Sequence, residues 1–278
     1  MTFEYLAAAY FLLIAVLAPF SGASARRAAA VMLAACGAAA SIIGVMHAVP
    51  LLLRVWAGGV YLGGGYWLPA LLVTRSPGAF EAWLQRCEPG AARTLWVGGS
   101  AGEQTARVWT ELAYLCCYPL VPAAFIAVYI NGSADDLDRF WTAVLGSGFF
   151  CYISLPWLVS RPPRILESRA DPRSPQTRTS SAVRRINLRV LDDVSHGWNT
   201  FPSGHVAIAI AAALAVTAVS PVAGMTFLAV ACGVAVGSVS GRYHYVVDAV
   251  AGLVVGVAAN AVSAYVVSAY AVAGFSRP

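Results

Sequence analysis

Residues 199–205 read Asn-Thr-Phe-Pro-Ser-Gly-His and lead directly into an apolar run from Val206 to Val219. Proline fixes φ, serine can cap a helix, and glycine lets the backbone approach a ligand, so the pattern predicts a helix that begins at this turn. The free N–H groups and positive dipole end of such a helix favour a bound anion. A histidine on its first turn is placed to move protons on a bound phosphate. A capped helix with a buried histidine gives the same local pattern, so other residues must decide.

The composition is that of a polytopic membrane protein. Of the 278 residues, 59% are hydrophobic and only 11% are charged, and the mean hydropathy is +0.69. A soluble domain carries about 25% charged residues. All 18 cationic residues are arginines, and the net charge is +5. Loop arginines at anionic lipid headgroups explain this charge, so we expect membrane lipids as partners and no nucleic acid.

The cysteines indicate neither a disulfide framework nor a zinc site. The chain has six of them, and no two are spaced as C-x-x-C. We therefore expect no metal and no cofactor. The first apolar stretch lacks a basic segment before it, so it reads as a retained span rather than a cleaved signal.

The apolar runs predict an all-α membrane helix bundle. A bilayer core takes roughly 20 apolar residues per helix. By that rule we expect eight spans, at approximately 3–20, 28–48, 51–73, 108–130, 139–159, 204–220, 222–241 and 245–273. Gly59-x-x-x-Gly63 in the third span and Gly252-x-x-x-Gly256 in the eighth predict close contacts between helices.

Two of the polar connections have patterns of their own. Apolar residues at i, i+3 and i+4 within 80–86 predict a short helix lying in the membrane interface. Asp135, Asp136 and Asp138 form an acidic run, which predicts a solvated loop in preference to a cation site.

The chemistry-bearing residues should meet on one membrane face. Spans alternate in direction, so the connections after spans one, three, five and seven share a side. This brings together residues 161–164 (Arg-Pro-Pro-Arg), the turn at 203–205, and residues 242–244 (Arg-Tyr-His). His244 and Asp248 are four residues apart, so on a helix they share a face, and the carboxylate can orient the imidazole.

Such a set supports phosphoryl transfer without a metal. Arginines and backbone N–H groups hold the phosphate oxygens and neutralise developing charge. One histidine attacks phosphorus, while the other protonates the leaving oxygen and then deprotonates the incoming water.

These residues resemble the type 2 phosphatidic acid phosphatase (PAP2) superfamily, which is related to vanadium haloperoxidases. Residues 202–205 (Pro-Ser-Gly-His) match its second motif, and residues 241–248 resemble its third. The resemblance implies His244 as the phosphohistidine nucleophile, Asp248 as its orienter and His205 as the general acid and base. It also implies that the substrate phosphate is bound by Arg161, Arg164, Ser203, Gly204 and Arg242.

The resemblance covers roughly spans three to eight. We therefore predict residues 49–278 as a PAP2-like catalytic membrane domain with a six-helix core, in which residues 161–202 form the active-site loop. Residues 1–48 are expected to be two accessory transmembrane helices.

The chain departs from the usual motifs in two places. The first motif carries a Lys seven residues before its Arg-Pro, where this chain has Ser154. The third carries an Arg six residues before its histidine, where this chain has Ser238, and the nearest arginine is Arg242. Both departures resemble the branch that contains inositol phosphorylceramide synthase, whereas Gly204 follows the phosphatase pattern.

Several functions are open at this point. The first is a lipid-phosphate phosphatase with water as the acceptor, and the second is a phosphotransferase that moves a phospho-headgroup between lipids. A haem protein with His205 and His244 as axial ligands gives Asp248 and the arginines no role. An anion transporter would be expected to place its polar site near the bilayer midplane rather than at helix ends. The apolar surroundings favour a lipid phosphate as substrate, and nothing in the chain fixes an oligomeric state.

Arginine distribution and family resemblance disagree about orientation. Six arginines outside the site lie on the same face as the site and three on the other: Arg26, Arg27, Arg75, Arg86, Arg93 and Arg107 against Arg54, Arg139 and Arg277. The positive-inside rule would then put the site in the cytoplasm. The resemblance implies a multi-pass protein of the plasma (inner) membrane with an extracytoplasmic site. We favour the latter, because arginines beside an anionic-lipid site bias the count.

Overall fold

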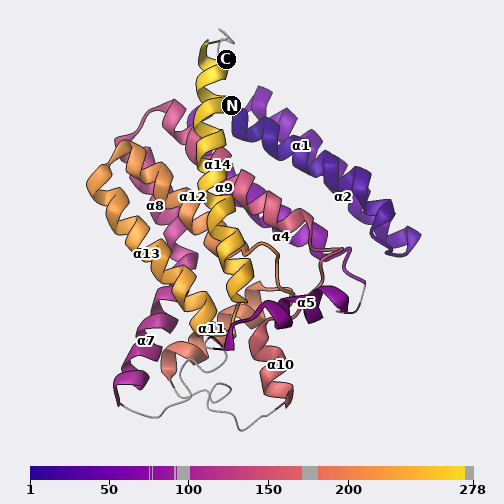
Figure 1. Ribbon diagram of the computed structural model, residues 1–278. Coiled ribbons are helices and arrows are strands. Elements are labelled where there is room, and N and C mark those ends of the chain that lie inside the picture. The colour runs from indigo at the N-terminus through magenta and orange to yellow at the C-terminus, as the bar shows by residue number, and fades with distance from the viewer. Residues whose placement is uncertain (75, 77, 91, 93–100, 171–180, 273–278) are drawn as a thin grey trace.

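The computed structural model describes all residues except 75, 77, 91, 93–100, 171–180 and 273–278 (Figure 1). The described part of the chain is helical, with one isolated antiparallel bridge between Ser160 and Asn199. Its helices are α1 (Thr2–Leu17), η1 (Ala18–Phe20), α2 (Ala25–Ala48), α3 (Leu51–Arg54), η2 (Val55–Ala57), α4 (Gly58–Ala70), α5 (Ala79–Cys87), α7 (Ala101–Leu115), α8 (Cys117–Asn131), α9 (Ala134–Ile153), α10 (Pro163–Ala170), α11 (Ala182–Val194), α12 (Gly204–Val219), α13 (Pro221–Ser240) and α14 (Val246–Val272). Three of the arginines used in the sequence analysis lie outside the described residues: Arg75, Arg93 and Arg277.

The all-helical class is confirmed, but the expected number of spans is not. Among the described residues, four helices are long and apolar enough to cross a bilayer: α1 with η1, α2, α13 and α14. The pair α7 and α8, bent by 50°, raises the number to five if it counts as one span. The third expected span is divided into α3, η2 and α4, and α12 has only 16 residues. Several apolar helices of this kind fit a multi-pass membrane protein.

Helix α12 forms the centre of the bundle. It is apolar all round, and all but a few of its residues are buried. It packs against α8, α9, α13 and α14. A helix that is hydrophobic on every side is stable only inside a larger bundle, so the apolar run after the Ser-Gly-His turn organises the helices around it.

The glycines of α14 confirm the predicted close contact between helices. A Cβ atom on Gly252 would lie 2.6 Å from the carbonyl oxygen of Ser203, and one on Gly256 would lie 2.5 Å from that of Ala207. Only hydrogen fits there, so α14 approaches α12 backbone to backbone.

The acidic run after α8 is helical, so the predicted solvated loop is wrong. Ser133 and Asp136 form a capping box, in which each side chain accepts from the other residue's backbone N–H, and this starts α9. Asp138 is buried and accepts from the backbone N–H groups of Thr2 and Phe3, both at 3.0 Å. The carboxylate thus satisfies the first N–H groups of α1 and ties it to α9.

Three short helices gather at one end of the bundle, where α14 begins. These are α5, α10 and α11 (Figure 1). The predicted short helix at 80–86 is present as α5, and its Leu84 is buried. Trp83 and Phe80 both contact the ring of Phe201 in the turn before α12. This end of the bundle carries the polar residues singled out from the sequence.

Candidate active site

The turn before α12 is held by contacts within the protein. The N-cap Ser203 accepts from the backbone N–H of Val206 at 3.5 Å, and the N–H of Gly204 donates to the Thr200 hydroxyl at 3.1 Å. The N–H of Ser203 donates to the backbone oxygen of Asp248 at 2.9 Å. A Cβ on Gly204 would lie 2.8 Å from the Tyr152 ring. Several N–H groups expected to be free for phosphate are therefore already bonded.

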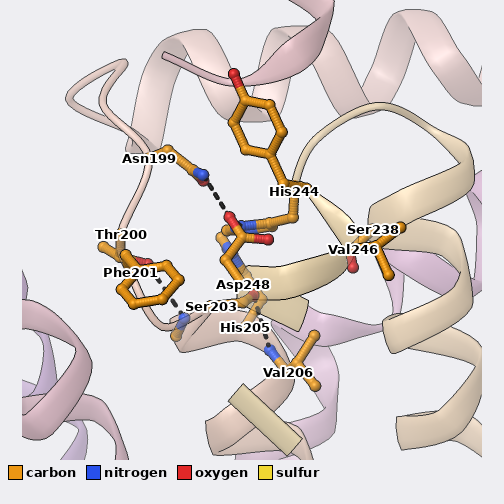
Figure 2. Close-up of polar contacts among 12 residues, drawn as sticks. Asn199, Thr200, Phe201, Ser203, His205, Val206, Ser238, His244, Val246 and Asp248 are labelled. Atoms are coloured by element: carbon orange, nitrogen blue, oxygen red, sulfur yellow. Dashed lines mark hydrogen bonds and ion pairs between the residues drawn. The ribbon is translucent and has the colours of Figure 1, made fainter. Parts of the chain in front are cut away.

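A chain of hydrogen bonds orients His244. Its Nδ1 lies 3.2 Å from Oδ2 of Asp248, and the Asn199 side-chain amide donates to the same oxygen at 2.5 Å (Figure 2). Asp248 is fully buried and His244 nearly so. With its Nδ1 proton donated to the carboxylate, the imidazole has a lone pair on Nε2. The predicted pairing at i, i+4 is present.

Asn199 is a site residue that the sequence reasoning did not assign. Asn199 is the first residue of the 199–205 stretch, but the sequence pattern gave no function for its side chain. Its backbone N–H donates to the Ser160 oxygen at 2.8 Å, which fixes its side chain over Asp248. An asparagine beside a motif turn was the available signal.

The two histidines meet, as expected from their places at the ends of two helices. Nε2 of His244 lies 3.3 Å from Nδ1 of His205, with the ring centroids 5.6 Å apart. If His244 has its free lone pair on Nε2, then His205 has its proton on Nδ1. A phosphoryl group bonded to Nε2 would occupy this space, so the contact must open when a phosphate binds.

Arg242 shapes the turn that carries His244. It adopts a left-handed backbone (φ 60°), and the N–H groups of Tyr243 and His244 both donate to the Ser238 oxygen at 2.9 Å. Its guanidinium, itself buried, forms ion pairs with Glu167, at 2.7 Å, and with Glu88. Burial lowers the pKa of Arg242, but these carboxylates outweigh burial and raise it above its ordinary value.

Arg161 is also paired with a carboxylate. Its guanidinium binds Glu81 through two hydrogen bonds, at 2.7 and 3.0 Å, and its backbone N–H donates to the same side chain at 2.8 Å. The hydrogen bonds to Glu81 raise the pKa of Arg161. Ser154, at the place of the usual motif Lys, donates to the backbone oxygen of Phe201 at 2.6 Å. These residues hold the connecting segments together.

Arg164 occupies a different environment. Its guanidinium lies over the Tyr243 ring, 5.0 Å from the centroid, and no ion pair with it is found among the described residues. Burial lowers its pKa below the ordinary value. Of the three predicted phosphate-binding arginines, Arg164 alone lines the cavity into which His205 and His244 open.

That cavity has a volume of about 560 Å³ and two unlike ends. The polar end contains His205, His244 and Arg164. The other end is formed by Trp56, Phe125 and Trp141, and the ring of Phe125 contacts both tryptophan rings. Phe125 lies about two turns of α8 from Tyr118, whose ring contacts His205, so the apolar part is long.

A family model for the PAP2 superfamily matches residues 90–262, more than half of the chain. The chain belongs to the PAP2 superfamily. The matched residues include His205, His244, Asn199 and Asp248, and the match is consistent with phosphatase or phosphotransferase activity. No curated protein and no solved structure matches the chain. Within the described residues of this PAP2 domain, no group of three or more His, Cys, Asp or Glu could hold a metal ion.

Proposed function

We propose that the protein is an integral-membrane lipid-phosphate phosphatase that works without a metal and forms a phosphohistidine on His244. One observation carries this proposal. The hydrogen-bonded chain from Asn199 through Asp248 to His244 ends at a nitrogen that lies 3.3 Å from His205. A nucleophile fixed by a carboxylate, with a second imidazole beside it, is the arrangement that two-step phosphoryl transfer needs.

In the first step, Nε2 of His244 bonds to phosphorus while the bond from phosphorus to the lipid oxygen breaks. His205, as the imidazolium with a phosphate anion bound beside it, donates a proton to that leaving oxygen and becomes neutral, and the lipid alcohol departs. Arg164 binds non-bridging oxygens and offsets their developing charge. Asp248 stabilises the positive charge that forms on His244.

In the second step, His205 takes a proton from water, whose oxygen attacks phosphorus. The phosphorus–nitrogen bond breaks, inorganic phosphate leaves, and His244 returns to its starting state. An alcohol in place of water would give a new phosphomonoester, so the same intermediate also serves a phosphotransferase. We place the site on the extracytoplasmic face of the plasma membrane.

The lipid nature of the substrate is supported by the apolar cavity beside the histidines. Most of its wall is apolar, and α4, α8, α9 and α12 all contribute aromatic or aliphatic side chains to it. A soluble phosphate would leave this surface uncovered. A lipid would bury it, at about 0.8 kcal/mol per methylene group.

The test is phosphate release by detergent-purified protein from a panel of lipid phosphates, with a chelator present and with or without a lipid alcohol as acceptor. We expect activity in chelator, and a fall of at least about 10²-fold in His244→Ala and His205→Ala. His47→Ala, an exposed histidine on α2, is the matched control. Strict dependence on a divalent ion would exclude the proposed mechanism. Transfer to the alcohol in place of hydrolysis would make the protein a phosphotransferase.

A further inference from the structure

One face of α4 borders the cavity with glycines where other helices present side chains. Trp56, Gly59, Gly63 and Tyr66 recur at intervals of three and four residues, so they share a face, and all four line the cavity. A Cβ on Gly59 or Gly63 would meet no atom within 4 Å. The wall between Trp56 and Tyr66 is therefore backbone with open space in front of it.

This open face differs from what a Gly-x-x-x-Gly pair predicts. In α14 the same spacing brings two helices into backbone contact, with Cβ positions blocked at Gly252 and Gly256. In α4 the packing role falls to Gly58 and Gly65, where a Cβ would collide with Trp141 and Phe149 of α9. Gly59 and Gly63 thus enlarge the cavity, and they bring no other helix of the described structure into close contact with α4.

The position of the two glycines follows the length of the cavity. Trp56 stands at the apolar end and is 53% exposed. Ile126 of α8, which also lines the cavity, is 46% exposed. The cavity therefore reaches the outer surface of the bundle there. Gly59 is exposed near this opening, and Gly63 is half-buried. Gly63 is one turn closer than Gly59 to Tyr66, whose ring contacts Tyr152, and Tyr152 in turn packs against Gly204 beside His205. A volume of about 560 Å³ falls within the range of about 300–1,000 Å³ that is usual for ligand sites.

We propose that Gly59 and Gly63 determine which substrates the site accepts, by leaving room for one long hydrocarbon chain of a lipid phosphate. The chain extends from the phosphate at Arg164 and His244, passes Gly63 and then Gly59, and reaches Trp56 at the outer surface. This inference rests on the proposed function, because the phosphate must lie at the histidines for the chain to lie along α4.

The test compares Gly59→Leu and Gly63→Leu with Gly37→Leu, using alkyl phosphates from butyl to hexadecyl at a fixed mole fraction in detergent micelles. Gly37 on α2 is the matched control, since a Cβ there also meets nothing within 4 Å and the residue is outside the cavity. All three changes replace glycine by leucine in a helix and gain the same helix propensity.

For the unaltered protein we expect kcat/KM to rise with chain length, by up to about fourfold per buried methylene. Gly63→Leu should keep the activity toward butyl phosphate within about twofold. It should lose the gain from longer chains, at least about tenfold for hexadecyl phosphate. Gly59→Leu should cut off only the longest chains, because it stands farther from the phosphate. Gly63→Ala, a smaller change, should give a weaker form of the same defect.

A chain-length profile that is the same in both α4 variants and in Gly37→Leu would overturn the inference. A binding measurement separates this from failure of the proposed function. In His244→Ala protein, hexadecyl phosphate with a terminal bromine should quench the fluorescence contributed by Trp56, seen as the difference from a Trp56→Phe protein. Gly63→Leu should abolish that quenching. If the ligand does not quench Trp56 even when Gly63 is unaltered, its hydrocarbon chain does not lie in the cavity, whether or not the protein hydrolyses lipid phosphates.

Discussion

At the scale of single residues, the orientation of His244 is the feature on which the chemistry depends most. The Asp248 carboxylate is fully buried and receives hydrogen bonds from both His244 and Asn199 on one oxygen. Its charge selects the tautomer with a lone pair on Nε2, and in the proposed mechanism it offsets the positive charge of the phosphoimidazole.

Asp248→Asn keeps the size of the side chain and removes its charge. We expect kcat to fall by roughly 10²–10⁴, because the neutral amide no longer fixes the tautomer. Rapid-quench measurement of phosphoenzyme formation should show that the first step is slowed. Asn199→Ala, which removes one neutral donor to the same oxygen, should cost about tenfold. Equal effects of the two changes would mean that the carboxylate charge is unimportant.

The three predicted phosphate-binding arginines separate into two kinds. Arg161 and Arg242 neutralise buried or partly buried carboxylates of the protein, whereas Arg164 faces the cavity. A cation paired with carboxylates attracts a substrate anion less than Arg164 does, since Arg164 is stacked on an aromatic ring and forms no ion pair within the described part of the chain.

Replacing these arginines should therefore affect different measurements. Arg164→Lys removes the bidentate geometry and should lower kcat/KM by about 10- to 100-fold with little change in melting temperature in detergent. Arg242→Ala leaves Glu88 buried without its partner and should destabilise the fold by about 3–5 kcal/mol. A stable Arg242→Ala protein with a raised KM would instead assign Arg242 to the substrate.

At the scale of helices, the site depends on the close approach of α14 to α12. Asp248, which orients His244, is on α14, and His205 is on α12. The hydrogen bond from the Ser203 N–H to the Asp248 oxygen joins the two helix ends. Glycines permit this approach, so the catalytic geometry is fixed by backbone contact.

Gly252→Ala and Gly256→Ala test this at two distances from the site. Each methyl group would collide with a carbonyl oxygen of α12, at 2.6 and 2.5 Å, so each should destabilise the protein by about 1–3 kcal/mol. Gly252 lies against Ser203, so its variant should also lose most of the activity of the folded protein. Gly256 lies one turn farther from the site, so the folded Gly256→Ala protein should keep its activity. Melting curves measure the stability, and kcat on the same preparations measures the activity. Equal losses of activity in the two variants would contradict a special role for the contact between Gly252 and Ser203.

The sequence predicts the meeting of the two histidines well, and it predicts the arginines poorly. Alternation of spans and the i, i+4 spacing are enough to bring His205, His244 and Asp248 to one end of the bundle. The partners of Arg161 and Arg242 come from α5, the residues after it and α10, and neither apolar periodicity nor a motif shows where such short helices dock. Asn199 had no signal beyond its place beside the turn, because its role depends on the bridge to Ser160.

At the scale of the whole molecule, the number of spans could not be predicted from apolar length alone. The third expected span is interrupted between α3 and α4, and the central α12 is short because it is enclosed by other helices. A helix that is shielded from lipid need not match the thickness of the bilayer, whereas the lipid-facing α2, α13 and α14 do.

Orientation is the property of the whole molecule that decides which lipids the site can meet. Cys87 is exposed at the end of α5, on the end of the bundle that carries the site, and Asn131 is exposed at the C-terminus of α8, on the opposite end (Figure 1). With Cys36 and Cys232 replaced by alanine, a membrane-impermeant maleimide should label Cys87 in intact cells. An Asn131→Cys, Cys87→Ser protein should be labelled only after lysis. The reverse pattern would place the site in the cytoplasm, where the excess of arginines on that face already points, and the substrate would then be a lipid of the inner leaflet.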